Sequence, residues 1–253
     1  MKVSIIVPSY MRSHLLRWNL WSLSRQVIPH AYEIIILNDG IEDDTTKLCS
    51  SYKEKLNIKY FFTGQRNRNG LVWRIPGYAI NIGVKQSDGD IIILCCAEMF
   101  HMNNSIQLIS AIFEQDDSDK IISIPQAKDD NGLFLRHLES DCESVGTLDY
   151  VRQPKLDNVR FPFFMAMRRE SFIDIGGYDE DFTGTDFDDT DFVRRLVHNG
   201  CEYKETNAMV VHLWHPRLPM SAERKPRYDY NQKLYNDREN IIVRNVGREW
   251  GIL

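Results

Sequence analysis

Three aspartates gathered in one short stretch offer the clearest opportunity for chemistry in this chain. Asp188, Asp189 and Asp191 follow Gly176-Gly-Tyr-Asp-Glu-Asp-Phe182 and lead into an amphipathic helix expected over residues 189–198. Carboxylates in a first helical turn are stabilised by the helix dipole and by free backbone N–H groups, so an acidic helix cap is one interpretation. The other is that one carboxylate faces a cleft and acts as a general base.

Three further polar segments stand where predicted strands end. Pro8–Arg12, Asn38–Gly40 and Cys95–Glu98 each directly follow a short apolar run rich in β-branched residues. The C-terminal ends of parallel strands share one edge of a sheet, where ligands bind, so we expect these segments to lie together. Taken singly, each carboxylate is also a common turn former or helix cap, and Tyr10 a packing residue. Their shared edge favours a binding site.

Short strands alternate with helices in the first half of the chain, and this order predicts an α/β fold. Apolar and β-branched runs predict strands at residues 3–7, 33–37, 58–62, 90–95 and 120–124. Helical spacing of apolar residues predicts helices at residues 15–23, 43–52, 75–84 and 104–114. We therefore expect a mainly parallel, Rossmann-like sheet flanked by helices on both faces.

The second half of the chain is less regular. Residues 126–160 show little periodicity and are interpreted as a long excursion, a hairpin or a loop over the site. Residues 216–253 are rich in Arg, Tyr and Asn and predict a helical tail against the body of a single domain. The remaining predicted elements are a strand at 161–167, helices at 169–175 and 189–198, and a strand at 207–214.

Composition and charge limit the class of protein. The chain is 43% hydrophobic and 26% charged, as in a soluble globular protein. Its formal net charge of −5 argues against binding nucleic acid through a basic surface. No apolar run approaches the roughly 20 residues that span a bilayer, and the N-terminus reads as a strand rather than a signal peptide. Five cysteines without C-x-x-C spacing are typical of reduced thiols, so we predict a cytoplasmic protein.

In their order along the chain, these segments resemble the motifs of glycosyltransferase family 2 on the GT-A fold. The opening Ser4-Ile-Ile-Val-Pro-Ser-Tyr10 is similar to the family's first strand and loop. Asn38-Asp-Gly40 stands where the family usually has Asp-Asp-Gly-Ser. Ala79-Ile-Asn-Ile-Gly83 is similar to Ala-Arg-Asn-x-Gly, and Asp188-Asp-Thr-Asp-Phe192 to Glu-Asp-x-Asp-Leu.

A further segment, Gly176–Phe182, resembles the C-terminal region of galactosyl- and N-acetylgalactosaminyltransferases. The resemblance implies inverting transfer of a sugar from a UDP-sugar to a hydroxyl of a glycan or lipid-linked acceptor. UDP-galactose or UDP-GalNAc is favoured as the donor, with UDP-glucose and UDP-GlcNAc as alternatives. A domain of residues 1–215 would contain a nucleotide-sugar half at 1–125 and an acceptor half at 126–215, followed by the tail 216–253.

The resemblance places the donor against the loops that follow the first strands. Tyr10 would lie against the base, and Asp39 would accept a hydrogen bond from the uracil or ribose. Arg74 would reach the base or the diphosphate, a task that suits a guanidinium fork, and Asn81 would brace the pocket. The donor-binding residues implied are Pro8, Ser9, Tyr10, Arg12, Asp39, Arg74, Asn81 and Cys96.

The metal motif of the family is only half present. Where the family has Asp-x-Asp, the chain has Cys96-Ala-Glu98, and a thiol is a poor ligand for a hard divalent ion. Glu98 keeps one carboxylate, and the resemblance implies that His212 or His215 supplies a second ligand. Because imidazole suits Mn²⁺ better than Mg²⁺, manganese is favoured over magnesium as the cofactor. In the alternative interpretation, one histidine packs against a neighbouring tryptophan and the other caps a turn.

The carboxylate cluster takes the catalytic role in this resemblance. Asp189 matches the general base of the family, which removes the proton of the acceptor hydroxyl as that hydroxyl attacks the anomeric carbon. Asp188 would contact the acceptor, and Asp191 would support the helix start or bind a sugar hydroxyl. Trp73 and Trp214 could stack on a sugar ring or pack in the core.

Two other functions remain open on the sequence. A non-catalytic protein that binds sugar nucleotides or glycans would explain the altered Cys96-Ala-Glu98 motif, although the Asp188-Asp189 pair argues against it. A nucleotidyltransferase would normally carry a Gly-rich basic loop after the first strand, which Pro8–Arg12 lacks.

The tail contains a modest group of basic residues. This group could approach anionic lipid as a peripheral membrane contact, or it could be a solvated face of the protein. Its members are Arg217, Arg224, Lys225 and Arg227.

Overall fold

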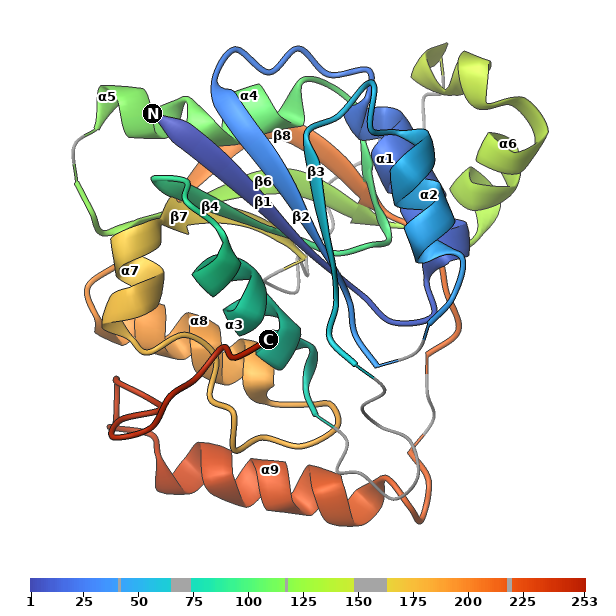
Figure 1. Cartoon of the computed structure of the whole chain (residues 1–253). Helices are drawn as coiled ribbons and strands as arrows, with labels where there is room; N and C mark the ends of the chain where they lie inside the picture. Colours follow the sequence, from blue (N-terminus) through green and yellow to red (C-terminus); the bar gives the residue numbers. More distant parts are fainter. Residues whose placement is uncertain (41, 65–73, 117, 148–162, 218–219) are drawn as a thin grey trace.

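One mixed eight-stranded sheet forms the centre of the molecule, with helices against both of its faces (Figure 1). The computed structural model describes residues 1–40, 42–64, 74–116, 118–147, 163–217 and 220–253. The strands lie in the order β3-β2-β1-β4-β7-β6-β8-β5. Strands β1–β4, β6 and β8 run in one direction, and β5 and β7 run in the other. The predicted α/β class with a mainly parallel sheet is confirmed.

The N-terminal part of the sheet is parallel, because helical crossovers return the chain to the same end after each strand. Three of its strands, β1, β2 and β4, are largely buried on both faces, which explains the continuous runs of Ile, Leu and Val in their sequences, whereas β3 at the sheet edge is only partly buried. The strands are β1 (Lys2–Ser9), β2 (Ala31–Asn38), β3 (Ile58–Phe62) and β4 (Ile91–Cys95). The helices between them are α1 (Ser13–Leu23), α2 (Thr45–Ser51) and α3 (Pro76–Gln86).

The second part of the sheet mixes strand directions, since β7 is antiparallel to both β4 and β6. Its strands are β5 (Met99–His101), β6 (Ile121–Asp129), β7 (Phe164–Arg168) and β8 (Glu202–His212). Its helices are α4 (Ser105–Ser110), α5 (Ile112–Gln115), α6 (Leu133–Asp141), the 3-10 turn η1 (Cys142–Thr147), α7 (Arg169–Asp174), α8 (Asp188–His198) and α9 (Lys225–Asp237).

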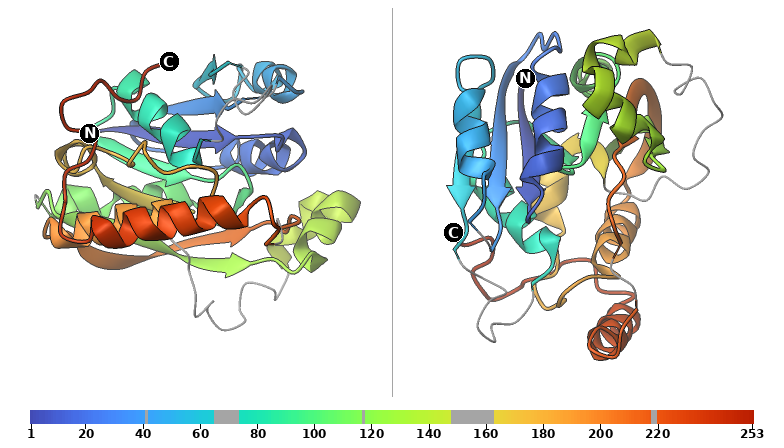
Figure 2. Two further views of the ribbon diagram at one scale, coloured as in Figure 1. Left: turned by 90° about the horizontal axis from the view of Figure 1, so that it is seen from below. Right: turned by 90° about the vertical axis from the view of Figure 1, so that its right-hand side faces the viewer.

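Two apolar layers sandwich the sheet, and strand alternation divides the residues between them. Along β1, Ile5 faces the layer covered by α1, α2, α4 and α5. Its neighbour Ile6 faces the layer covered by α3, α7 and α8, where Phe192 of α8 is completely buried. Helix α6 packs beside α1 in a smaller cluster through Phe134 and Leu138 (Figure 2). Both layers hold the strand ends rigidly in place.

Several predicted elements need correction. Because β7 is antiparallel, its beginning rather than its end lies at the edge where β1, β2 and β4 finish. The excursion predicted over residues 126–160 contains the end of β6, then α6 and η1, while residues 148–160 lie outside the described part of the chain. The helix expected at 104–114 is divided into α4 and α5, and β5 was not predicted.

The C-terminal segment is helical only in part. Helix α9 lies beside α8, and residues 238–253 continue without regular structure along the α3 and α7 side of the sheet (Figure 1). None of the described helices has the length and apolarity needed to cross a membrane.

Candidate active site

The edge of the sheet where β1, β2 and β4 end carries a cavity of about 590 Å³. It gathers residues from six separate segments, and three of these follow the ends of β1, β2 and β4, as the arrangement of parallel strands predicted. Asn81, however, does not line it. The lining residues are Pro8, Ser9, Tyr10, Met11, Arg12, Asp39, Arg74, Pro76, Cys96, Glu98, Gly184, Thr185 and Pro216.

Asp39 and Arg74 form one wall of this cavity as a buried ion pair. The backbone N–H of Asp39 bonds the carbonyl of Ser9 at 2.8 Å, which ties the loop after β2 to the end of β1. Nη2 of Arg74 bonds the Asp39 carboxylate and also the Thr63 hydroxyl, the latter at 2.8 Å. The guanidinium of Arg74 lies over the ring of Tyr78, 4.4 Å from its centroid. Pairing with Arg74 fixes the direction of the Asp39 carboxylate at the cavity wall.

Arg12 and Glu98 form another part of the cavity lining. Nε of Arg12 donates to Oε1 of Glu98 at 2.6 Å, and Nη2 of Arg12 lies 3.3 Å from Nδ1 of His215. The guanidinium therefore stands between two of the three predicted metal ligands. The third, His212, has its Nδ1 2.8 Å from Asp129, and its ring stacks on Phe163 with centroids 4.4 Å apart.

Cys96 lines this cavity and neighbours a second one of about 480 Å³ that contains the carboxylate pair, because its backbone N–H bonds the carbonyl of Phe163 in the second cavity at 2.8 Å. Burial, together with the nearby charge of Glu98, raises the pKa of the Cys96 thiol well above its ordinary value, so the sulfur stays protonated. A protonated thiol is a weak ligand for Mn²⁺ or Mg²⁺. The second cavity is lined by Phe163, Asp186, Phe187, Asp188, Asp189, Thr190 and Val193.

Asp188 and Asp189 both hold their protons more tightly than free carboxyl groups do. Burial raises the pKa of Asp189 to about 6, and a hydrogen bond from the Tyr178 hydroxyl at 3.1 Å lowers it in part. Burial and the adjacent charge of Asp189 raise the pKa of Asp188 well above its ordinary value. A carboxylate with a pKa near 6 is ionised at neutral pH yet basic enough to accept a proton.

Asp191, the third member of the cluster, is structural. Its carboxylate is fully buried and bonds Nε of Arg195 at 2.7 Å and Nη2 of Arg244 at 2.8 Å. Arg244 also lies 2.8 Å from Asp179 in the Gly-Gly-Tyr-Asp turn. The C-terminal segment therefore ties the start of α8 to this turn, and Asp191 does not face the cavity.

Asn81 braces the same turn from helix α3. Its Nδ2 donates to the carbonyl of Tyr178 and to Glu180, both at 2.9 Å, and its Oδ1 accepts the Tyr178 N–H at 2.8 Å. Asn81 thus holds the Gly-Gly-Tyr-Asp turn in place, and its place among the donor-binding residues stays a prediction. Of the two tryptophans considered, Trp73 lies outside the described residues, and Trp214 is 48% exposed beside His212 and His215.

Sequence reasoning missed two features of the site. Tyr178 was quoted as part of the Gly-Gly-Tyr segment, but its hydroxyl contact with Asp189 joins positions eleven residues apart and had no local signal. Asp186 and Phe187 adopt φ values of 83° and 70°, a conformation that non-glycine residues rarely take. Backbone strain of this kind gathers at functional sites.

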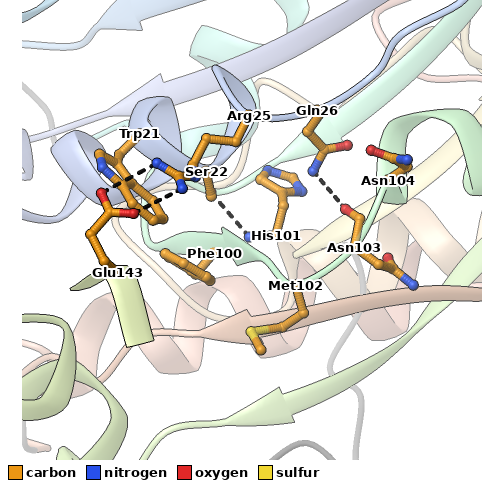
Figure 3. Close-up of a pocket in the computed structure, with 10 residues that line it drawn as sticks. All are labelled: Trp21, Ser22, Arg25, Gln26, Phe100, His101, Met102, Asn103, Asn104 and Glu143. Atoms are coloured by element: carbon orange, nitrogen blue, oxygen red, sulfur yellow. Dashed lines mark hydrogen bonds and ion pairs between the residues drawn. The ribbon is translucent and has the colours of Figure 1, made fainter. Parts of the chain in front are cut away.

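A further cavity of about 380 Å³ near α1 and β5 is structural (Figure 3). Trp21 is enclosed between Phe100, with centroids 5.8 Å apart, and the guanidinium of Arg25, 4.4 Å from its ring. Arg25 bonds Glu143 at 2.9 Å, and Nε2 of Gln26 bonds the carbonyl of Asn103 at 2.9 Å. These polar groups satisfy one another, and the cavity is lined by none of the predicted site residues.

Family comparisons agree with this arrangement of strands and site segments. Residues 4–176 match the model described as "Glycosyl transferase family 2", and residues 161–217 match "N-terminal domain of galactosyltransferase". The Bacillus subtilis glycosyltransferase YfnE is 23% identical over 85% of this chain and 66% of its own length. The chain also matches a poly(ribitol-phosphate) β-N-acetylglucosaminyltransferase, TarS of Staphylococcus aureus, with 26% identity over 48% of this chain and 20% of TarS.

Solved structures share the fold. TarS residues 1–349 in complex with UDP-GlcNAc superpose with a TM-score of 0.56 and 18% identity, covering 87% of this chain and 60% of that one. A mannosyltransferase of Pyrobaculum calidifontis in complex with GDP-Man and Mn²⁺ gives a TM-score of 0.56 and 15% identity, covering 88% and 59% of the two chains. The chain therefore spans about three fifths of each of these structures and shares their α/β architecture.

Proposed function

Because the chain belongs to glycosyltransferase family 2 and is a glycosyltransferase, we propose that it transfers a sugar from a UDP-sugar to an acceptor hydroxyl with inversion. The observation that carries this proposal is the carboxylate of Asp189. It has a pKa of about 6 and lies on the wall of a cavity that neighbours the one holding Arg12 and Glu98, since Cys96 of the latter cavity bonds Phe163 of the former at 2.8 Å. A general base and an anion-binding group thus lie in neighbouring cavities, an arrangement that suits inverting displacement.

The donor fits the larger cavity. Arg74 and Tyr10 line it and supply a guanidinium fork and an aromatic ring, which suit a uracil base and a diphosphate. The TarS fold has been observed with UDP-GlcNAc, and the C-terminal match to a galactosyltransferase domain supports UDP-galactose or UDP-GalNAc. We keep the latter two as the favoured donors, with UDP-glucose and UDP-GlcNAc as alternatives. Residues 1–125 would supply the donor half and residues 126–215 the acceptor half.

The reaction is a single displacement at the anomeric carbon. Asp189 accepts the proton of the acceptor hydroxyl while the hydroxyl oxygen forms a bond to the anomeric carbon. The bond from that carbon to the β-phosphate oxygen breaks, and UDP leaves with the electron pair. Tyr178, held by stacking against Phe192 at a centroid distance of 4.2 Å, fixes the direction of the Asp189 carboxylate. The guanidinium of Arg12 would stabilise the negative charge that develops on the diphosphate.

Manganese as cofactor stays a prediction, supported by the donor atoms that surround Arg12. Glu98 and His215 offer a carboxylate oxygen and an imidazole nitrogen, a pair that suits Mn²⁺. Such ions usually take only one or two protein ligands and complete their shell with phosphate oxygens and water. Bound there, Mn²⁺ would supply positive charge to the diphosphate, and Arg12 would have to release Glu98. Within the described chain, no three His, Cys, Asp or Glu side chains form a ready metal cluster, and His212 is held by Asp129.

Replacing Asp189 by Asn tests the assignment of the base. Transfer should fall by about 10²–10⁴-fold, because the amide cannot accept the proton, while UDP affinity in calorimetry should be unchanged. Asp229→Asn, on the exposed side of α9, is the matched control. Unchanged turnover in Asp189→Asn would overturn the assignment. Absence of transfer and hydrolysis with every UDP-sugar would instead favour a non-catalytic sugar-nucleotide-binding protein, an alternative suggested by the Arg12–Glu98 contact.

The acceptor is proposed to be a glycan or a lipid-linked sugar. A peripheral membrane contact through the basic residues of the tail stays a prediction. Arg217 pairs with Asp129 at 2.9 Å, and Arg224 pairs with Asp186 at 2.6 Å, so both charges are already partly balanced within the protein. Binding to anionic vesicles, measured by co-sedimentation, would test the contact.

A further inference from the structure

The cavity beside Asp189 has charged lining residues of one sign only. Among its described lining residues, Asp186, Asp188 and Asp189 are acidic and none is basic. Its volume of about 480 Å³ lies within the roughly 300–1,000 Å³ typical of small-molecule sites. The cavity therefore has the size of a ligand site and a negative potential.

Asp188 points to a ligand more directly than the other two. Its side chain is buried, with 6% of the residue exposed, and it lines the cavity. Its polar partners are the backbone N–H groups at the start of α8, and no described side chain bonds its carboxylate. A carboxyl group kept in such a place without a cationic partner is costly to the fold and is typical of a functional site.

The cation that bonds Asp186 of this cavity, Arg224, is already engaged. Nη2 of Arg224 bonds both carboxylate oxygens of Asp186 at 2.6 Å, and its Nε lies 3.1 Å from one of them. Asn231 of α9 holds the same loop through the carbonyls of Thr183 at 2.8 Å and Thr185 at 3.0 Å. Helix α9 thus fixes the acidic loop and neutralises Asp186 while presenting no cation among the described lining residues.

The apolar part of the cavity is aromatic. Phe163 stacks on His212 through one face of its ring. Phe187 packs edge-on against Tyr228 with centroids 5.0 Å apart. Carboxylates that accept hydrogen bonds from hydroxyl groups, beside aromatic rings that contact a C–H surface, match the mixed polar and apolar surface of a sugar.

We propose that this cavity is the acceptor subsite and that it selects a sugar with no anionic substituent near the attacked hydroxyl, rejecting phosphorylated and carboxylated sugars. The proposal rests on the proposed function and adds the chemical class of the acceptor. Its physical basis is like-charge repulsion. An anionic group in this cavity is opposed by the negative charge that the Asp188–Asp189 pair carries at neutral pH.

A series of four sugars that differ in one substituent tests the selectivity. Glucose, glucosamine, glucuronate and glucose 6-phosphate are added separately to the enzyme with its UDP-sugar donor, and UDP release is measured. A sugar that binds in the cavity either accepts the transferred sugar or excludes water, so it changes the rate of UDP release in both cases. The half-effect concentration of each anionic sugar should be at least about tenfold above that of glucose, equivalent to about 1.4 kcal/mol. A smaller ratio, or no effect of any of the four sugars, overturns the proposal.

Asp186→Asn provides a variant test of the same idea. Asparagine tolerates the positive φ of this position, and the change removes the ionic partner of Arg224 at the cavity. The ratio between anionic and neutral sugars should fall by about tenfold or more, because Arg224 can then pair with the anionic substituent. Asp229→Asn on α9, whose partner is Lys225, should leave the ratio unchanged. An unaltered ratio in Asp186→Asn overturns the electrostatic argument.

The two failures are distinguishable. If UDP-sugars are hydrolysed but the anionic sugars act as well as glucose, the acceptor class is wrong and the proposed transferase function stands. If the enzyme releases no UDP from any donor under any metal, the proposed function itself fails.

Discussion

The hydrogen bond from Tyr178 to Asp189 predicts a shift in the pH dependence of catalysis. The Tyr178 hydroxyl stabilises the ionised form of Asp189 and so lowers a pKa that burial raises to about 6. Replacing Tyr178 by Phe removes the hydroxyl and retains the ring, which stacks on Phe192 at an interplanar angle of 3°. The pKa of Asp189 should therefore rise in the variant.

The size of the shift follows from the strength of the lost contact. A hydrogen bond to a charged group contributes about 1.5–3 kcal/mol, and one pKa unit corresponds to about 1.36 kcal/mol. The pH of half-maximal kcat/KM should move from about 6 to about 7–8. Activity at pH 6 should then fall by roughly five- to fifty-fold, whereas activity at alkaline pH should remain, because there the base is ionised in both proteins.

Initial rates of UDP release measured from acidic to alkaline pH test this prediction. Tyr230→Phe, a change on the exposed face of α9, is the matched control and should leave the profile unchanged. A uniform loss of activity at every pH would show that Tyr178 acts through packing alone. An unmoved midpoint would refute the assignment of Asp189 as the ionising base.

Three other predictions concern the same region. Asp189→Asn should stabilise the fold at neutral pH by up to ~3 kcal/mol, because the folded pKa of about 6 exceeds the ordinary 3.8 and ionisation between those values destabilises the native state. That gain should vanish below about pH 4 in urea denaturation, where the wild-type carboxyl is protonated in both states. Glu98→Gln should abolish the Mn²⁺-dependent part of UDP affinity in calorimetry, with wild-type protein in EDTA as reference; equal affinity with and without Mn²⁺ in the wild type would contradict the metal site. Arg244→Ala should lower the free energy of unfolding by about 3–5 kcal/mol, since it strips a buried partner from Asp191, whereas Arg248→Ala at a half-exposed pair should lower it by less than about 1 kcal/mol.

The position of the site could be predicted because it depends on local patterns. Short β-branched runs separated by helices determine a parallel arrangement, and parallel strands bring their ends to one edge. Pro8–Arg12, Asp39 and Glu98 follow such runs and line one cavity. These residues come together because parallel strands end at the same edge of the sheet, whatever contacts their side chains make.

The hydrogen-bond partners of the site residues could not be predicted from the sequence. Arg12 and Glu98 are 86 positions apart, and both types suit several partners, so only the packed structure selects their contact. The same holds for Asn81, whose contacts with Tyr178 and Glu180 bridge nearly a hundred positions. The family resemblance implied that Asn81 braces the pocket, but it gave no indication of the contacts with Tyr178 and Glu180.

The antiparallel direction of β7 could not be predicted, for a different reason. The sequence of β7 has the same apolar composition as a parallel core strand, and direction is determined by the connection that precedes it. That connection includes α6, which buries only Phe134 and Leu138 and was not predicted as a helix. The sequence consequently indicated a strand at the correct place and left its direction open.

The ion pairs between the C-terminal segment and α8 affect how the enzyme matures during synthesis. Arg244 follows its partner Asp191 by 53 positions, and the N–H of Gly251 bonds Glu180 in the turn before α8. Because ribosomes add only about 5–20 residues per second, the sheet and donor cavity have seconds to form before these partners emerge. Arg195 lies within α8, so Arg244 is the buried partner of Asp191 that is synthesised well after the helix. A nascent chain stalled before residue 244 should therefore bind nucleotide yet transfer nothing.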